Sequence, residues 1–149
     1  MNDQPDQHWH VVRTVELGAS ASEVWEVIGG FFTIHEWHPD ITLTEIPPDQ
    51  TAVRQLRRIL TFPGQPKTQE ELVSMDNDDF HYRYKWHQGA WGERVKHYKA
   101  SLRVFAGDLE KTCIVQWESV FDYPTDAISD FYLHGFRELQ TRFPLTNKE

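Results

Sequence analysis

A long amphipathic pattern near the end of the chain constrains the fold most. Within residues 123–144 (YPTDAISDFYLHGFRELQTRFP), apolar residues recur at the three- and four-residue spacing of one helix face. This spacing predicts one long α-helix, which Thr125 or Asp126 can cap and which ends before Pro144. A helix with one apolar face needs a concave apolar partner. The apolar positions are Ile128, Phe131, Tyr132, Gly135, Phe136, Leu139 and Phe143.

The residues before this helix are typical of β-strands. The clearest strand covers residues 80–87, where four aromatic residues alternate with four basic ones. The aromatic residues of this segment should face the core, and the basic residues should face water. The predicted strands are 8–17, 41–46, 52–62, 67–75, 80–87, 95–106 and 112–122.

Two short helices are predicted directly after the first strand. Ser20 and Glu23 have the spacing of a capping box, which predicts a helix start before the apolar residues 24–28. Residues 31–37 predict a second short helix or turn, which Pro39 ends.

The order of the predicted elements indicates the fold class. A strand, two short helices, six strands and a long helix favour an α+β domain in which a curved, seven-stranded antiparallel sheet surrounds the C-terminal helix. The 149 residues suit a single domain, residues 8–149, after a tail of residues 1–7. We expect function to lie in the space between helix and sheet.

Composition and charge exclude several classes of function. The net charge is −8 and the Lys and Arg residues are scattered, which argues against a nucleic-acid-binding protein. No apolar run approaches the ~20 residues of a membrane span, and the polar N-terminus is not that of a signal peptide. Cys113 is the single cysteine, so no internal disulfide can form. A cytoplasmic location follows as the default expectation. Both a monomer and a homodimer remain open.

Several short motifs, taken in order, resemble a known superfamily. They are Val24-Trp25, Trp37-His38-Pro39, Val53-Arg54, Glu70-Glu71-Leu72 with Asp76, Tyr82-Arg83-Tyr84, Tyr98, Trp117, and Gly135-Phe136 with Leu139. Their order and spacing resemble the helix-grip fold of the START-like superfamily, in particular its bacterial polyketide cyclase/dehydrase branch (SRPBCC family). The resemblance implies a large internal cavity for a hydrophobic or aromatic small molecule. It does not imply one chemistry, because the family contains both binders and enzymes.

The aromatic residues of the predicted inner faces suggest how such a ligand is held. Buried Tyr and Trp side chains need polar partners, so this many of them fit a lined cavity better than a dry core. Trp37 would plug the cavity and His38 would lie at its rim. At Gly135, either a strand backbone packs closely against the helix or the missing side chain leaves ligand volume, and we favour ligand volume. The expected ligand contacts are Trp37, His38, Arg58, Glu70, Tyr82, Tyr84, Trp86, Trp91, Tyr98, Trp117, Tyr132 and Gly135.

An arginine should meet a carboxylate across the hairpin around Gly64. A loop of odd length pairs Arg58 with Glu70, and a loop of even length pairs it with Glu71. One interpretation is an ordinary surface ion pair. The other is an inward-facing pair, which is costly to bury and would be retained to anchor a polar group of the ligand.

Only a few residues are candidates for catalysis or for metal binding. The catalytic candidates are Glu70 and His38 for proton transfer and Tyr84, or Tyr98, for polarising a carbonyl. His35 and His38, with Asp40 as the nearest third ligand, lack the spacing of known zinc motifs, so no metal is expected. No cofactor is expected either. Three functions stay open: acid/base cyclisation or dehydration, a non-catalytic carrier or sensor, and a protein–protein interaction module.

Overall fold

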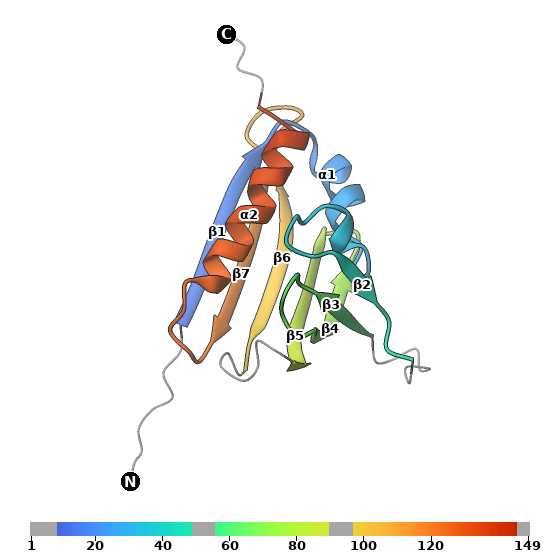
Figure 1. Cartoon of the computed structure of the whole chain (residues 1–149). Helices are drawn as coiled ribbons and strands as arrows, with labels where there is room; N and C mark the ends of the chain where they lie inside the picture. The colour runs from blue at the N-terminus through green and yellow to red at the C-terminus, as the bar shows by residue number, and fades with distance from the viewer. Residues whose placement is uncertain (1–8, 49–55, 90–96, 146–149) are drawn as a thin grey trace.

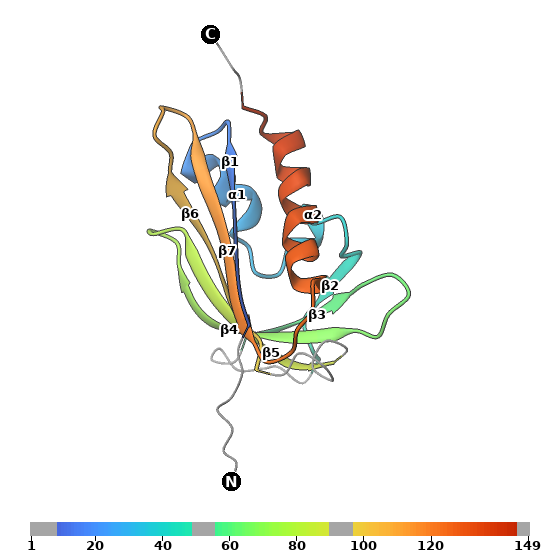
Figure 2. The ribbon, with the colours of Figure 1, turned by 90° about the vertical axis from the view of Figure 1, so that its left-hand side faces the viewer.

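A seven-stranded antiparallel sheet curls around one long C-terminal helix in the computed structural model, which describes residues 9–48, 56–89 and 97–145 (Figures 1 and 2). The strands lie in the order β1-β7-β6-β5-β4-β3-β2. The elements are β1 (Trp9–Leu17), α1 (Ala21–Ile28), the 3-10 helix η1 (Ile34–Glu36), β2 (Leu43–Glu45), β3 (Arg57–Thr61), β4 (Thr68–Asp76), β5 (His81–Gly89), β6 (Lys99–Ala106), β7 (Cys113–Phe121) and α2 (Ala127–Arg142).

The long helix α2 confirms the prediction from the apolar stripe. It starts beside Thr125, whose Oγ1 accepts a hydrogen bond from the backbone N–H of Ala127 at 3.1 Å. It ends where the N–H of Phe143 donates to the carbonyl of Leu139, directly before Pro144. Figure 2 shows the sheet curving beside and beneath this helix. The buried residues of α2 are Ile128, Phe131, Tyr132, Gly135, Phe136 and Leu139.

The segment after β1 contains a helix and a turn, as predicted. The capping box forms, because Glu23 N–H donates to Ser20 Oγ and Ser20 N–H donates to the Glu23 carboxylate, and α1 follows. The second predicted helix is only the single 3-10 turn η1. η1 lies between the helix-breaking Gly29-Gly30 and Pro39.

The strand alternation divides the sheet into an inner face, toward α2, and an outer face. On β5 the inner residues Tyr82 and Tyr84 are buried, while Arg83 and Lys85 are exposed. This confirms the predicted alternation. The inner face, α1 and α2 share one aromatic core, in which Trp117 of β7 stacks on Tyr132 of α2 at 4.3 Å between ring centroids.

Three of the strands, β2, β3 and β6, are shorter than predicted, and β6 starts at Lys99, after His97 and Tyr98. β2 lies at the edge of the sheet and pairs only with β3, so it keeps three residues. β3 starts at Arg57, and the predicted strand residues 52–55 lie outside the described residues, as do Val53-Arg54 of the motif set and the expected tail 1–7. Among the described helices, none is both long and apolar enough to cross a membrane.

Candidate functional site

Four inner-face residues form a row across neighbouring strands, called the polar row below. Arg58 of β3 lies opposite Glu70 of β4, and Glu70 lies opposite Trp86 of β5. The N–H of Trp86 donates to the carbonyl of Tyr98, which directly precedes β6. The antiparallel register therefore brings together side chains that are up to 40 positions apart in the chain.

The ion pair at one end of the polar row is buried. Arg58 Nε and Nη2 donate to Glu70 Oε1 at 3.0 and 2.7 Å, and Arg58 Nη1 donates to the carbonyl of Phe31 at 2.7 Å. The guanidinium also lies 3.9 Å from the ring centroid of Phe31. Of the two registers left open by the sequence, the structure has the one that pairs Arg58 with Glu70, and the pair faces inward.

Burial sets the protonation of this pair. It raises the pKa of the Glu70 carboxyl above its ordinary value, and the neighbouring Arg58 cation limits that rise. Burial alone would lower the pKa of Arg58, but the neighbouring Glu70 carboxylate raises that pKa, so Arg58 remains a cation. Glu70 is thus a carboxyl group with an elevated pKa at a fixed position, which suits both ligand anchoring and proton transfer.

A chain of hydroxyl groups continues from the other end of the polar row. Tyr98 Oη lies 2.6 Å from Tyr132 Oη and 3.2 Å from Tyr84 Oη, and Trp117 Nε1 donates to Tyr84 Oη at 2.9 Å. Burial raises the pKa of all three tyrosines, so each keeps its proton at neutral pH. They are therefore neutral hydrogen-bond donors, as the polarisation of a carbonyl requires.

Two hollows meet at Tyr98. The inner hollow lies between the sheet and the first half of α2, has a volume of about 10 Å³, and is lined by Phe62, Glu70, Tyr98, Ile128 and Phe131. The end hollow lies where β5 extends past the start of β6 and has a volume of about 350 Å³. Tyr98 lines both hollows. The end hollow is lined by Glu71, Lys85, Trp86, His87, His97, Tyr98 and Lys99.

The predicted rim residue His38 is a packing residue. Its ring stacks on Phe131 at 4.0 Å, its Nε2 donates to the carbonyl of Phe131 at 2.7 Å, and its Nδ1 accepts from the Asp40 N–H at 3.1 Å. Burial lowers its pKa to about 4. Because the ring is neutral and both nitrogens are engaged by the backbone, His38 is a poor general acid or base, which argues against that candidate.

The expectation of ligand volume beside Gly135 is wrong. A Cβ on Gly135 would lie 2.7 Å from Cδ2 of His38 and 3.1 Å from Cζ3 of Trp37. Side chains from the segment after η1 therefore fill the space that the glycine leaves. Trp37, predicted as a plug of the cavity, lies in this same packed region against Trp117, at 5.7 Å between ring centroids.

The structure thus brings together only part of the predicted site. Arg58, Glu70, Trp86 and Tyr98 form the polar row, and Tyr84, Tyr132 and Trp117 are joined to it by hydrogen bonds. Trp37, His38 and Gly135 pack together elsewhere along α2. Tyr82 contacts Trp25 and Phe31 at the α1 end of the core. Trp91 lies outside the described residues.

Sequence reasoning missed several residues that line the hollows. Phe62, Ile128 and Phe131 of the inner hollow were not predicted as ligand contacts, because their apolar character matches any buried position. No sequence pattern marks His87 and His97 as residues of the end hollow. A register shift between Gln69 and Glu70 displaces the β4–β5 pairing beside His87, and such a bulge cannot be read from residue types.

The three residues considered for a metal have separate partners. His35 Nδ1 lies 2.9 Å from Thr44 Oγ1, and Asp40 Oδ2 lies 2.7 Å from His134 Nδ1. Within residues 9–48, 56–89 and 97–145, no three His, Cys, Asp or Glu side chains are grouped so that they could hold a metal ion.

Comparisons with known proteins agree with this architecture. The family described as polyketide cyclase / dehydrase and lipid transport matches residues 8–142. No curated protein matches the chain.

Solved structures share the fold at low sequence identity. The protein XoxI from Bacillus cereus is 23% identical, with a TM-score of 0.80 over 90% of this chain and 94% of that one. Norcoclaurine synthase from Thalictrum flavum, solved with dopamine and hydroxybenzaldehyde, is 16% identical, with a TM-score of 0.66 over 96% of this chain and 91% of that one. Major latex-like protein 151 from Panax ginseng is 15% identical, with a TM-score of 0.69 over 92% and 98%.

Proposed function

Because the chain belongs to the polyketide cyclase/dehydrase and lipid transport family, we propose that it binds a hydrophobic or aromatic small molecule where Tyr98 separates the inner hollow from the end hollow. The observation that carries this proposal is the position of Tyr98 as a common wall. A movement of its side chain would join the two spaces and open a path from the end hollow to the carboxyl group of Glu70.

The end hollow has the properties of a small-molecule site. Its volume of about 350 Å³ falls within the range of roughly 300–1,000 Å³ typical of such sites. Trp86 supplies an aromatic surface, and its buried Nε1 has no hydrogen-bond partner among the described residues. A ligand carbonyl or hydroxyl would satisfy that donor, which otherwise carries a desolvation cost.

Charge around the end hollow narrows the class of ligand. Among the described residues that line it, Lys85, Lys99, His87 and His97 outnumber one carboxylate, that of Glu71. A planar aromatic molecule with a carbonyl group and a phenolate or carboxylate fits this surface better than a cationic one.

Binding can be tested with the aromatic sulfonate dye 1-anilinonaphthalene-8-sulfonate. We expect saturable binding near one equivalent, competed by aromatic polyketides or fatty acids. Trp86→Ala should weaken dye binding up to about tenfold, because a contact between two aromatic rings is worth ~0.5–1.5 kcal/mol beyond the area it buries. The control Phe105→Ala removes an exposed aromatic ring on the outer face and should change affinity less than about twofold. Equal affinities in all three proteins would place dye binding elsewhere and contradict the proposal.

A second candidate function, acid/base catalysis on the bound molecule, is favoured by the raised pKa of Glu70, which lines the inner hollow together with Tyr98. Glu70 would accept and return a proton while Tyr98 polarises a carbonyl, as aldol cyclisation or dehydration requires. Tyr84, hydrogen-bonded to Tyr98, would position that hydroxyl.

Two conservative variants separate an enzyme from a carrier. For any ligand that competes with the dye, its conversion is followed by mass spectrometry. Glu70→Gln and Tyr98→Phe keep the shape of the site, so an enzyme should lose ~10²–10⁴-fold in rate with little change in binding. If bound ligands are recovered unchanged from the wild-type protein, the carrier or sensor alternative holds. If no apolar probe binds, the interaction-module alternative is favoured.

A further inference from the structure

The outer face of the sheet carries a cluster of positive charge on a protein whose net charge is −8. Its cations come from the outward positions of β5 and β6. Those of β5 belong to the basic half of the alternating pattern in residues 80–87, and Lys85 and Lys99 also line the end hollow. The cluster consists of Arg83, Lys85, Lys99 and Arg103, with the His81 ring opposite Arg103.

The strand register places like charges directly opposite each other. Lys85 of β5 pairs with Lys99 of β6. Like charges at directly opposed positions destabilise an antiparallel pair. Stability therefore does not explain this pair, and Lys99 lines both the end hollow and the hollow of the outer face described next.

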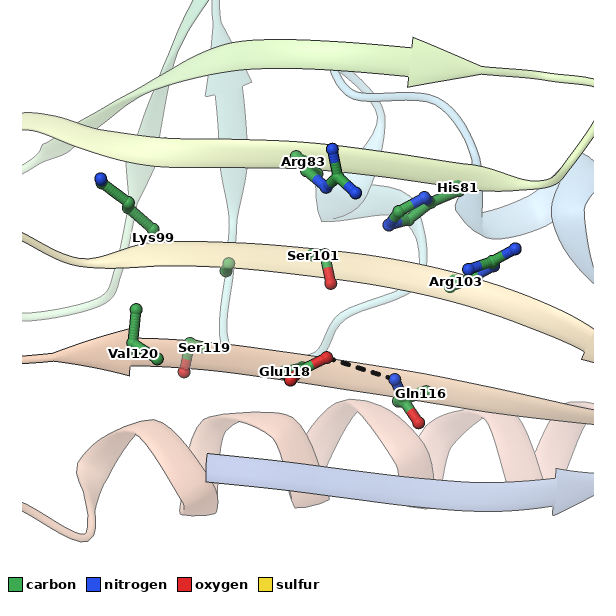
Figure 3. A pocket seen from close by; sticks show the side chains of 10 residues that line it. His81, Arg83, Lys99, Ser101, Arg103, Gln116, Glu118, Ser119 and Val120 are labelled. Atoms are coloured by element: carbon green, nitrogen blue, oxygen red, sulfur yellow. Dashed lines mark hydrogen bonds between the residues drawn. The ribbon is translucent and has the colours of Figure 1, made fainter. Parts of the chain in front are cut away.

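A hollow lies at the centre of this cluster. Its volume is about 340 Å³, and the small side chain of Ser101 lies in its middle (Figure 3). Arg83 lies opposite Ser101 on β5 and Glu118 lies opposite it on β7, while Lys99 and Arg103 lie two residues to either side on β6. Three cations and one hydroxyl therefore surround one space that is open to solvent.

The neighbouring acids leave much of this charge uncompensated. Arg103 forms an ion pair with Asp79. Glu118, the carboxylate that lines the hollow, is engaged by Gln116 at 3.3 Å and by His10 at 2.8 Å on the side of β1. Within the described residues, neither Arg83 nor Lys99 takes part in an ion pair.

We propose that this hollow binds the phosphate group of a small phosphorylated molecule. Arg83 and Arg103 would clamp the phosphate oxygens with paired N–H donors, Lys99 would add a point charge, and the Ser101 hydroxyl would donate a hydrogen bond from the floor. The volume admits a phosphate monoester with a few carbon atoms. The site lies on the face of the sheet opposite α2. It shares Lys99 with the end hollow, but its other phosphate contacts, Arg83, Ser101 and Arg103, are its own, so it does not require a ligand in the end hollow.

The test is an amide NMR titration with inorganic phosphate and with glycerol 3-phosphate at low ionic strength, against chloride at matched ionic strength. We expect saturable shifts centred on residues 81–83, 101–103 and 116–118, with the ester binding more tightly. Arg83→Gln should weaken binding about fivefold to tenfold, since it removes charge-assisted hydrogen bonds. Lys67→Gln is the matched control, because it removes the same charge from a lysine that pairs with Glu45 outside the cluster.

Two further variants separate a shaped site from diffuse attraction. Ser101→Phe keeps every charge but fills the hollow, and it should abolish saturable binding. Glu118→Gln removes the opposing carboxylate and should tighten binding about twofold to fivefold. The proposal is overturned if Ser101→Phe binds normally, if Lys67→Gln and Arg83→Gln weaken binding equally, or if the protein binds phosphatidylglycerol vesicles but no soluble phosphate.

Discussion

At the scale of single residues, Gly135 shows how one neighbouring ring can determine which residue a helix position accepts. Glycine in a helix interior costs about 1 kcal/mol relative to alanine, so a neighbouring element must require it. Here the His38 ring takes the place of the missing Cβ. That ring is held by two backbone hydrogen bonds and by stacking on Phe131, so it cannot move aside cheaply.

Gly135→Ala should therefore destabilise the protein by about 1–3 kcal/mol in urea unfolding, because overpacking exceeds the gain in helix propensity. A double-mutant cycle with His38→Ala is the control, since removal of the ring should turn the added methyl group from unfavourable to neutral or favourable. A stabilised Gly135→Ala single variant would contradict the close contact.

His38 also makes stability depend on pH. Burial lowers its folded-state pKa to about 4 from an ordinary value of 6.5. Below pH 6.5 His38 becomes protonated in the unfolded chain, whereas in the folded protein it stays neutral down to about pH 4. The free energy of unfolding should therefore decrease as the pH falls from 6.5 to 4. The loss should approach roughly 3 kcal/mol, at about 1.4 kcal/mol per pKa unit.

Urea unfolding between pH 7 and pH 4.5 measures this dependence. His38→Gln should remove most of it. Burial also lowers the pKa of His81, but that residue is more exposed, so His81→Gln should retain most of the pH dependence. A wild-type protein whose stability does not change over this range would show that His38 is protonated in the folded state.

At the scale of elements, the β3–β4 hairpin is joined across its inner face by a charge pair rather than by apolar contacts. Removing one partner of a buried pair leaves an uncompensated charge and costs about 3–5 kcal/mol. We expect Glu70→Leu alone to lose an amount of this order. In the double variant Arg58→Leu/Glu70→Leu, apolar side chains replace both ions and most of the stability should return.

Thermal unfolding of the two variants and of wild type tests this coupling. A double variant as unstable as the single one would show that the hairpin needs the pair for folding. If the double variant recovers stability but loses dye binding, the result would instead support a role of the pair in ligand binding.

The elements themselves were largely predictable from sequence, because their signals are local. The α2 stripe, the Ser20 capping box and the β5 alternation depend on spacing within one segment, and all three are confirmed. The contents of the site were less predictable. Whether His38 or a ligand fills the space beside Gly135 depends on contacts between segments about 100 residues apart, which no local pattern encodes.

At the scale of the whole molecule, the interior is unusually rich in hydroxyl groups for an aromatic core. Burial raises the pKa of four of the five tyrosines: Tyr82, Tyr84, Tyr98 and Tyr132. Each binds its proton more tightly when folded than when unfolded. Their contribution to stability is thus present below pH 10 and is lost as pH rises above it.

We therefore expect alkaline unfolding to be steep and cooperative. Tyrosinate absorbance at 295 nm should develop together with the loss of far-ultraviolet circular dichroism. Tyr98→Phe should remove one ionisation and make the transition less steep. Ionisation of four tyrosines well before any loss of secondary structure would show that solvent reaches the hydroxyl chain in the native protein.

The strand order has a consequence for how this chain is made. β1 lies at the edge of the sheet and pairs only with β7, so after its synthesis it has no sheet neighbour until residue 121 has been added. At about 5–20 residues per second, the intervening ~100 residues take about 5–20 s to synthesise. Throughout that time the apolar face of β1 is exposed in a nascent chain. The protein is thus most vulnerable to aggregation before it is complete, when a chaperone that shields a single amphipathic strand would be of most use to it.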